Sequence, residues 1–275
     1  MSSSAVDWYA HADVLLKDLI ARHSDEYGLG TMSPSIYDTA WVSLVSRNVG
    51  GHSHWVFPES FQYIYEAQNG DGGWSGDGST ADAVINTLAC LLSLIRHKEA
   101  WLASGVIDIV TCIDKATAFL HEKLPDLDVL STERIAFEVV VPSLLDMLEE
   151  EGIKFDFPQL STLRRLNQKK LAKINFEMIY AAHTTLLHSL EAFVGKLDFD
   201  RVAHLKRGGN LMASPSSTAA YLMSASTWDE EAEQYLRHVL SQCKSTPKGA
   251  VPNVWPTTVF EFSWVCLRLA QFTSS

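Results

Sequence analysis

Cysteine is scarce in this sequence of 275 residues. The four cysteines, at positions 90, 112, 243 and 266, are widely separated, and no two of them form a C-x-x-C pair. A disulfide framework or a structural zinc site needs cysteines at short or regular spacings, so the sequence excludes both. We therefore expect four buried thiols in a reducing compartment.

Long hydrophobic runs are also missing. The longest, residues 84–95, is interrupted by Asn86, Thr87 and Ser93 and is too short to span a bilayer. The first residues lack the basic and apolar regions of a signal peptide and the arginine-rich composition of a transit peptide. We expect no membrane span and a cytoplasmic location.

Positive charge is in short supply. Lys and Arg total 22 against 33 for Asp and Glu, which gives a formal net charge of −11. A surface this acidic argues against nucleic acid or an anionic membrane as a partner. Hydrophobic residues make up 47% and charged residues 20%, the composition of a folded globular chain.

Several catalytic motifs are absent. The sequence contains no G-x-x-x-x-G-K-[ST], G-x-S-x-G or H-E-x-x-H, and no D-D-x-x-D cluster. The nearest approach to D-x-D-D is residues 198–201 (DFDR), in which arginine takes the fourth position. Common nucleotide-hydrolysing, serine-hydrolase and zinc-protease chemistries are therefore not indicated.

Helical periodicity recurs along the chain, and the alternation of a β-strand is almost absent. Apolar residues fall at i, i+3, i+4 and i+7 in 84–95, 139–148, 186–193, 219–223 and 260–269. Glycine, proline and serine separate these segments. We predict an all-α fold of eight to eleven helices, with an N-terminal cap at Ser79 or Thr80 for the first segment and at Ser216 or Ser217 for the fourth.

A weak internal repeat refines this fold class. Residues 71–74 (DGGW) lead to 79–81 (STA) and an apolar helix, and residues 208–211 (GGNL) lead to 217–219 (STA) and another. A glycine-rich turn followed by a capped inner helix is typical of stacked helical hairpins, which can close into an α/α-barrel. Residues 68–74 (QNGDGGW) are interpreted as a structural turn.

One short segment carries an excess of positive charge. Residues 164–173 hold five cations and no acid. On a helix, Lys170 shares a face with positions 166 and 173 and can point inward while its neighbours stay solvated. Two interpretations remain open: a solvated basic face, or an anchor for a phosphate or diphosphate in which Lys170 acts as a point charge.

Three more residues are candidates for chemistry. His188, alone on an apolar segment, is either a core histidine or a general base in a dry pocket. Asn253, held between Pro252 and Pro256, is either part of a plain turn or an amide aimed at a histidine or a water. Glu138 leads an apolar run, and is either a charge at a helix N-terminus or an acid near a metal-bound anion.

Several segments together resemble class II diterpene cyclases. Residues 35–42 (SIYDTAWV) resemble a segment near the start of these enzymes, and six further matches follow in the same order from about Tyr27 to Leu269: residues 57–60, 68–74, 137–145, 187–191, 214–219 and 252–256. Residues 187–201 and 214–238 are especially similar to the fungal copalyl diphosphate/ent-kaurene synthases.

This resemblance implies a fold and a reaction. Residues 31–275 would form the helical γ domain, an α/α-barrel-like domain, and residues 1–30 an N-terminal helical segment. In the family, a β domain packs against the γ domain, and the active site between them converts geranylgeranyl diphosphate to copalyl diphosphate. The middle Asp of D-x-D-D protonates the substrate, and the cation closes two rings before losing a proton.

The resemblance also implies roles for individual residues. His188 and Asn253 match the histidine and asparagine that take the final proton through a water molecule. Lys170 matches a lysine that contacts the diphosphate, and Glu138 matches an acid linked to magnesium. The implied cofactor is therefore magnesium, and the implied substrate is geranylgeranyl diphosphate.

The D-x-D-D motif belongs to the β domain and does not occur in these 275 residues. Without a strong acid, nothing in the chain can protonate an unactivated alkene. We expect this chain alone to be inactive and to need the β domain, and an α domain as well if the enzyme is bifunctional. The alternatives are a non-catalytic helical module that completes a partner cyclase, a decayed gene product, or an unrelated α/α-barrel enzyme such as a glycosidase.

Overall fold

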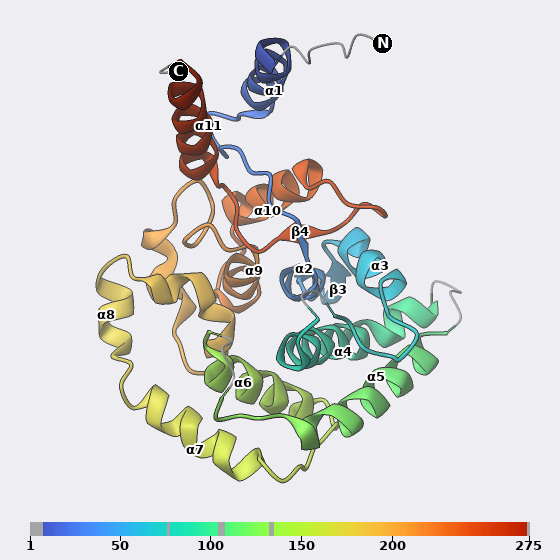
Figure 1. Cartoon of the computed structure of the whole chain (residues 1–275). Coiled ribbons are helices and arrows are strands. Elements are labelled where there is room, and N and C mark those ends of the chain that lie inside the picture. The colour runs from blue at the N-terminus through green and yellow to red at the C-terminus, as the bar shows by residue number, and fades with distance from the viewer. Residues whose placement is uncertain (1–7, 76–77, 104–107, 132–134, 274–275) are drawn as a thin grey trace, which may run out of the picture.

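The computed structural model describes residues 8–75, 78–103, 108–131 and 135–273, and helices dominate this part of the chain (Figure 1). Its α-helices are α1 (Trp8–Arg22), α2 (Ile36–Ser43), α3 (Pro58–Glu66), α4 (Thr80–Ala103), α5 (Ile109–Lys123), α6 (Phe137–Glu150), α7 (Leu160–Leu171), α8 (Phe176–Ala181), α9 (Pro215–Ser224), α10 (Glu230–Gln242) and α11 (Thr258–Thr273). Three 3₁₀ segments are η1 (Leu124–Asp126), η2 (Thr185–Phe193) and η3 (Phe199–Leu205).

The inner elements pack in a closed ring. Helix α2 contacts α4, α4 contacts α6, α6 contacts η2, η2 contacts α9, and α9 returns to α2. An outer layer covers this ring, with α3 on α2, α5 on α4, α7 on α6 and α10 on α9 (Figure 1). The predicted all-α, α/α-barrel-like fold is confirmed.

The core of the ring is apolar and fully buried. Helix α4 is buried over most of its length, from Ala83 to Leu94, because it lies between α2, α5 and α6. Trp41 and Trp74 are among the largest side chains excluded from solvent. Burying such side chains stabilises the fold by roughly 1.5–3 kcal/mol for each large apolar residue.

The predicted helix starts are confirmed in one case and wrong in the other. Ser79 accepts a hydrogen bond from the Asp82 backbone amide and so caps α4, as the sequence predicted. Helix α9 begins earlier than predicted: its cap is Ser214, whose hydroxyl accepts from the Ser217 amide at 3.1 Å, with Pro215 in the first turn. A proline fits there because its missing amide hydrogen has no partner in the first helical turn.

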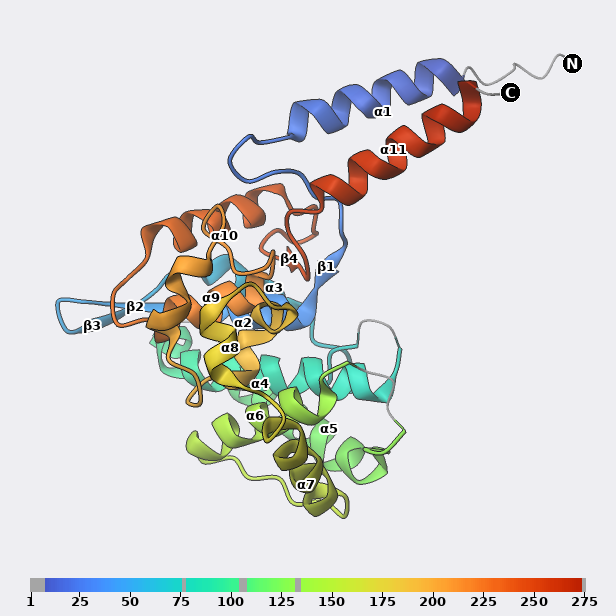
Figure 2. The ribbon, with the colours of Figure 1, turned by 90° about the vertical axis from the view of Figure 1, so that its left-hand side faces the viewer.

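Two short antiparallel pairs were not predicted. Strands β2 (Ser46–Val49) and β3 (His52–Trp55) form a hairpin that projects from the ring (Figure 2), and β1 (Pro34–Ser35) pairs with β4 (Val251–Pro252). The hairpin turns at two glycines with positive φ, Gly50 and Gly51. Only the end of β3 reaches the core, where Trp55 packs against Phe61 and His97.

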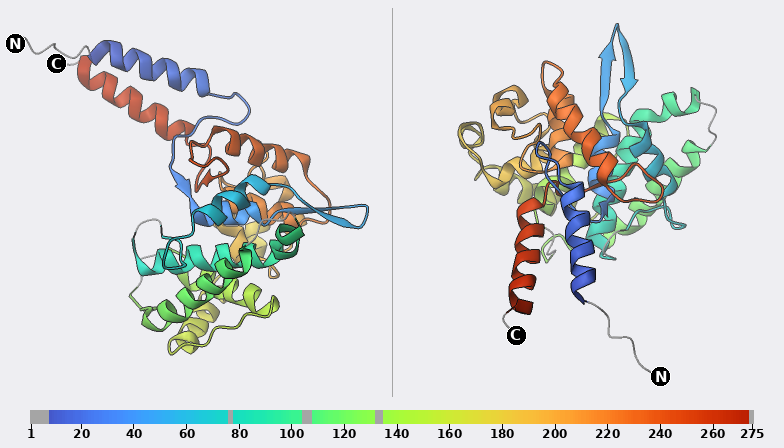
Figure 3. Two further views of the ribbon diagram at one scale, coloured as in Figure 1. Left: turned by 90° about the vertical axis from the view of Figure 1, so that its right-hand side faces the viewer. Right: turned by 90° about the horizontal axis from the view of Figure 1, so that it is seen from above.

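Helices α1 and α11 stand outside the ring, beside one another (Figures 2 and 3). This position corrects one prediction, that all four cysteines are buried. The four are free thiols, and Cys90 in α4 is buried, whereas Cys266 in α11 is exposed. None of the described helices combines the length and apolarity that crossing a membrane requires.

Candidate active site

An apolar cavity of about 480 Å³ opens where α6, α7 and η2 meet. Its walls are mostly aliphatic and aromatic, including Val139 and Phe193, and four polar side chains also line it: Lys170, Thr185, His188 and Ser189. Mostly apolar walls with a few placed polar groups are typical of sites for small hydrophobic molecules. The structure therefore brings two of the predicted site residues into one cavity.

His188 lies on η2, and the regular helix predicted for residues 186–193 is wrong. The segment is a 3₁₀ helix broken at Ser189, where φ is −138° and ψ is 39°. The hydroxyl of Ser217, at the start of α9, accepts from the Leu190 amide and donates to the Leu187 carbonyl, at 3.1 and 2.7 Å. These contacts hold the backbone on both sides of His188 and keep the segment from forming a regular α-helix.

The hydrogen bond of His188 fixes the roles of its two ring nitrogens. Nδ1 lies 3.0 Å from the backbone carbonyl oxygen of Met212. A carbonyl oxygen only accepts, so we assign the hydrogen of the neutral ring to Nδ1. Nε2 then keeps a lone pair, which is what a general base requires.

Lys170 and Glu138 form an ion pair across α7 and α6, with Nζ and Oε1 2.9 Å apart. Partial burial raises the pKa of Glu138, but the hydrogen bond and charge of Lys170 outweigh this and lower it overall. Asn167, one turn before Lys170, donates to the Glu138 carbonyl oxygen at 2.8 Å. The Lys170 side chain is half exposed, so its ammonium group is both held in place and accessible.

Glu138 is an isolated candidate for a metal ligand. Within the described ranges, no three His, Cys, Asp or Glu side chains lie close enough together to hold a metal ion. A magnesium ion bound to phosphate oxygens needs only one or two carboxylates from the protein. Glu138 alone therefore fits a magnesium ion that is bound mainly to phosphate oxygens, and it does not form a resident metal centre.

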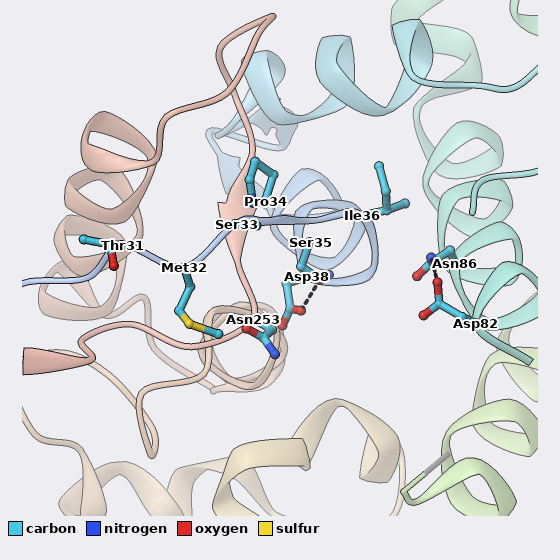
Figure 4. Close-up of a pocket in the computed structure, with 10 residues that line it drawn as sticks. All are labelled: Thr31, Met32, Ser33, Pro34, Ser35, Ile36, Asp38, Asp82, Asn86 and Asn253. Carbon is cyan, nitrogen blue, oxygen red and sulfur yellow. Dashed lines mark hydrogen bonds between the residues drawn. The ribbon is translucent and has the colours of Figure 1, made fainter. Parts of the chain in front are cut away.

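Asn253 lines a neighbouring cavity of about 410 Å³, which is more polar (Figure 4). Asp38, Asp82 and Asn86 lie on its other walls, and the Asn86 amide donates to Asp82 at 3.0 Å. The residue after Asn253, Val254, lines the cavity of His188. Asn253 therefore lies outside the cavity that Lys170 and His188 line, and its chain neighbour Val254 connects the two cavities.

The segment that carries Asn253 is held from several sides. The Trp255 amide donates to the Ala213 carbonyl at 2.8 Å, and the Tyr235 hydroxyl donates to the Trp255 carbonyl at 2.6 Å. The indole of Trp255 is buried and donates to the Tyr27 carbonyl at 3.1 Å. These bonds give Asn253 a fixed position while its side chain stays exposed.

Two buried acids beside the site were not predicted as functional. Asp38 and Glu191 are 5% and 2% exposed, and the Tyr37 hydroxyl donates to Glu191 at 3.2 Å. Burial, with a further contribution from the negative charge of Asp38, raises the pKa of Glu191 to about 8. Each acid interrupts an apolar run in the sequence, at 36–42 and 190–194, and that pattern was the available signal.

Asp38 connects these acids to His188. Burial raises the pKa of Asp38, whereas hydrogen bonds from Ser216 and Ser35 act to lower it, as does the charge that His188 carries when its ring is protonated. The Ser35 hydroxyl donates to Asp38 at 2.6 Å. The pKa of Asp38 is raised overall, and that of Glu191 is raised to about 8, so Glu191 is protonated near neutral pH.

Curated proteins similar to this chain are fungal terpenoid-forming enzymes, although no protein-family model matches it. It is 48% identical over 260 residues to the bifunctional premutilin synthase of Rhodocybe pseudopiperita. The alignment covers 94% of this chain and 27% of that enzyme. It is 43% identical over 265 residues to the copalyl diphosphate synthase of Talaromyces verruculosus, covering 95% and 28%. The ent-kaur-16-ene synthase of Phaeosphaeria sp. is 44% identical over 253 residues, covering 89% and 27%.

Solved structures give the same result. One match is the ent-copalyl diphosphate synthase of Arabidopsis thaliana in complex with (S)-15-aza-14,15-dihydrogeranylgeranyl thiolodiphosphate, with a TM-score of 0.73 and 32% identity. The match covers 94% of this chain and 35% of the Arabidopsis chain. The ent-copalyl diphosphate synthase of Streptomyces platensis matches 95% and 51%, with a TM-score of 0.69 and 28% identity.

The ring of helices and these neighbours define a helical domain of the terpene cyclase type. More particularly, the chain is a homologue of class II diterpene cyclases, and its relatives are the fungal premutilin, copalyl diphosphate and ent-kaurene synthases. The resemblance predicted from the sequence is confirmed. The chain spans 27–28% of the length of these curated relatives.

Proposed function

We propose that this chain is the γ-domain portion of a diterpene cyclase that converts geranylgeranyl diphosphate to copalyl diphosphate by protonation-initiated bicyclisation. The observation that carries the proposal is the apolar cavity that Lys170 and His188 both line. The names of the relatives support the same reaction. They also favour a cyclase over a glycosidase.

Each of the four predicted site residues has a role in this proposal. Lys170 attracts the diphosphate, which stays attached throughout, and Glu138 holds the ammonium group in position. The cavity walls are mostly aliphatic and aromatic and hold few groups able to react with the carbocation. Nε2 of His188 takes the final proton through a water molecule, and the Asn253 amide holds that water.

Magnesium has a limited part in the proposal. The ion would be held mainly by diphosphate oxygens, with Glu138 as the nearby carboxylate, and it would neutralise part of the diphosphate charge. The residues of this chain bind and orient the substrate and remove a proton. None of these actions depends on a resident metal.

We also propose that a β domain of the same enzyme covers α1 and α11. Both helices present large apolar side chains to solvent: Leu15 on α1 is 64% exposed, and Val259 and Phe260 on α11 are 81% and 57% exposed. Contiguous exposed apolar surface usually marks an interaction site. The relatives are much longer than this chain, so each has further sequence to form such a cover.

The chain by itself is proposed to be inactive, because it offers no suitable proton donor. Asp198 and Asp200, the closest approach to D-x-D-D, are exposed, and hydrogen bonds from Ser226 lower the pKa of Asp200, so that it is ionised. Glu191 is protonated near neutral pH, but a carboxyl with a pKa of about 8 is a weaker acid than an ordinary one. Protonating an alkene needs a stronger acid, so the pKa of the donor would have to be lowered and not raised.

A chimeric enzyme tests this function. The chain replaces the residues it matches in the Talaromyces verruculosus copalyl diphosphate synthase, and the chimera and the isolated chain are each incubated with geranylgeranyl diphosphate. We expect copalyl diphosphate from the chimera and none from the chain. A folded but inactive chimera contradicts the proposal.

Supplying the remainder of the Talaromyces enzyme as a separate polypeptide tests the module hypothesis. A non-catalytic module would form a stable complex with that polypeptide and restore its activity. A decayed gene product would fail to fold both in the chimera and as a separate polypeptide. The cytoplasmic location predicted from the sequence stays a prediction.

A further inference from the structure

We propose that Asn210 is a positioning residue that fixes His188 and the Asn253 segment relative to each other. It does so through the turn of residues 207–214, in which two consecutive residues, Met212 and Ala213, are left-handed, with φ of 51° and 57°. Left-handed backbone is unfavourable for residues other than glycine and persists only where neighbouring contacts impose it. This inference rests on the function proposed above.

The two left-handed residues present consecutive carbonyl groups to two different elements. The Met212 carbonyl accepts from Nδ1 of His188 at 3.0 Å. The Ala213 carbonyl accepts from the Trp255 amide at 2.8 Å, two residues after Asn253. One dipeptide therefore sets the distance between the histidine and the asparagine segment.

The side chain of Asn210 stabilises this unusual backbone. Its Oδ1 accepts from the Ala213 amide at 2.7 Å, and its Nδ2 donates to the Arg207 carbonyl. The backbone of Asn210 pairs with Arg207 in both directions, at 2.9 and 3.2 Å, which closes the turn. Asn210 is 9% exposed, so water does not readily replace its hydrogen bonds.

Loss of the Asn210 side chain would free Met212 and Ala213 to relax towards negative φ. The Met212 carbonyl would then move away from Nδ1, and the imidazole could rotate or move its hydrogen to Nε2. With Nε2 protonated, His188 cannot accept the final proton through that nitrogen. A water oxygen bonds to the carbocation instead, and the extra proton of that water passes to the solvent. The expected signature is a hydroxylated diphosphate in place of copalyl diphosphate.

The test compares Asn210→Ala with Asn210→Asp in the chimeric enzyme. Aspartate keeps an oxygen to accept from the Ala213 amide, so it should restore part of the wild-type product ratio. We expect Asn210→Ala to raise the hydroxylated fraction several-fold and to leave KM for geranylgeranyl diphosphate unchanged, because Lys170 is untouched. Asn48→Ala, on the exposed hairpin, is the matched control and should keep the wild-type ratio.

The outcomes separate this inference from the proposed function. If His188→Ala changes the products and a folded Asn210→Ala does not, the inference is wrong and the proposed function stands. If neither variant changes the products, His188 is not the base, and both the inference and the role proposed for His188 are wrong, whereas the cyclase function of the chimera stands. An equal loss of all products in Asn210→Ala, with an unchanged ratio, indicates a structural role only and also overturns the inference.

A measurement on the unmodified chain keeps the inference testable if Asn210→Ala does not fold. Histidine labelled with ¹⁵N reports which ring nitrogen carries the hydrogen, and His188→Ala identifies the resonance. At about pH 8.5, where imidazole is ordinarily neutral, we expect hydrogen on Nδ1 of His188. Hydrogen on Nε2 would overturn the inference.

Discussion

Asp38 and Glu191 are two acids that the fold withdraws from water within the same inner ring. An isolated buried carboxylate is costly, so one member of such a pair normally stays protonated. The serine hydroxyls near Asp38 support its charge, whereas Tyr37 is the donor to Glu191, whose Oε2 has no partner among the described residues. This asymmetry assigns the proton to Glu191.

A pH dependence of stability follows from Glu191. Its pKa of about 8 in the folded protein lies above that of an unfolded chain, so the folded state binds the proton more tightly. Its contribution is complete below the unfolded pKa and is lost as the pH rises through about 8, on the order of 5 kcal/mol in all. Thermal unfolding measured at a series of pH values between the unfolded pKa and about 8 reports this loss of stability.

Glu191→Gln should remove this dependence, because an amide does not titrate and can still accept from Tyr37. The difference in stability between the variant and the wild type should grow as the pH rises. Glu150→Gln, at an exposed position in α6, is the control and should follow the wild type at every pH. Parallel curves for Glu191→Gln and wild type would show that Glu191 does not carry the proton.

Much of the site could be predicted from the sequence, because its residues interrupt recognisable patterns. Lys170 stands in a basic run and His188 in an apolar one, and the fold brings both to one cavity. The Lys170–Glu138 pair could not be predicted, because it depends on how α6 and α7 pack. Nor could the left-handed Met212 and Ala213, since neither residue type favours that backbone.

Among the helices, the inner ones were predicted best. Helices α4 and α6 are long and buried by several neighbours, so their apolar periodicity is strong. Segment η2 has an equally apolar sequence, yet contacts with α9 break it at Ser189. Tertiary hydrogen bonds override local propensity there, and no local pattern reports them.

The turn between α3 and α4 gives a test of the predicted structural role of residues 68–74. Gly72 has φ of +92°, and a Cβ there would lie 2.5 Å from the Lys115 carbonyl oxygen in α5. Gly72→Ala should therefore lower the free energy of unfolding by about 2–3 kcal/mol. Chemical denaturation gives the value.

Gly70→Ala in the same turn is the matched control. A Cβ at Gly70 would meet no atom within 4 Å, and its φ is not positive. The expected change is below about 0.5 kcal/mol. Equal effects of the two substitutions would mean that close approach to α5 does not govern this turn.

At the scale of the whole molecule, the described residues divide into the ring and the two helices that stand outside it. The ring buries its own core, whereas α1 and α11 extend from it (Figure 2). Leu15 on α1 and Val259 and Phe260 on α11 are exposed to solvent. The predicted division at residue 30 sets α1 apart but leaves α11 with the ring. Sequence alone did not separate α11, because an exposed amphipathic helix and a buried one share the same period.

We propose that His188 removes the final proton in a cyclase assembled from this chain and a β domain. The direct measurement is the product distribution of the chimera carrying His188→Ala, beside His183→Ala at an exposed position just before η2. We expect a loss of copalyl diphosphate formation on the order of 10²-fold, with hydroxylated diphosphate in its place, for His188→Ala alone. An unchanged product distribution in folded His188→Ala would contradict it.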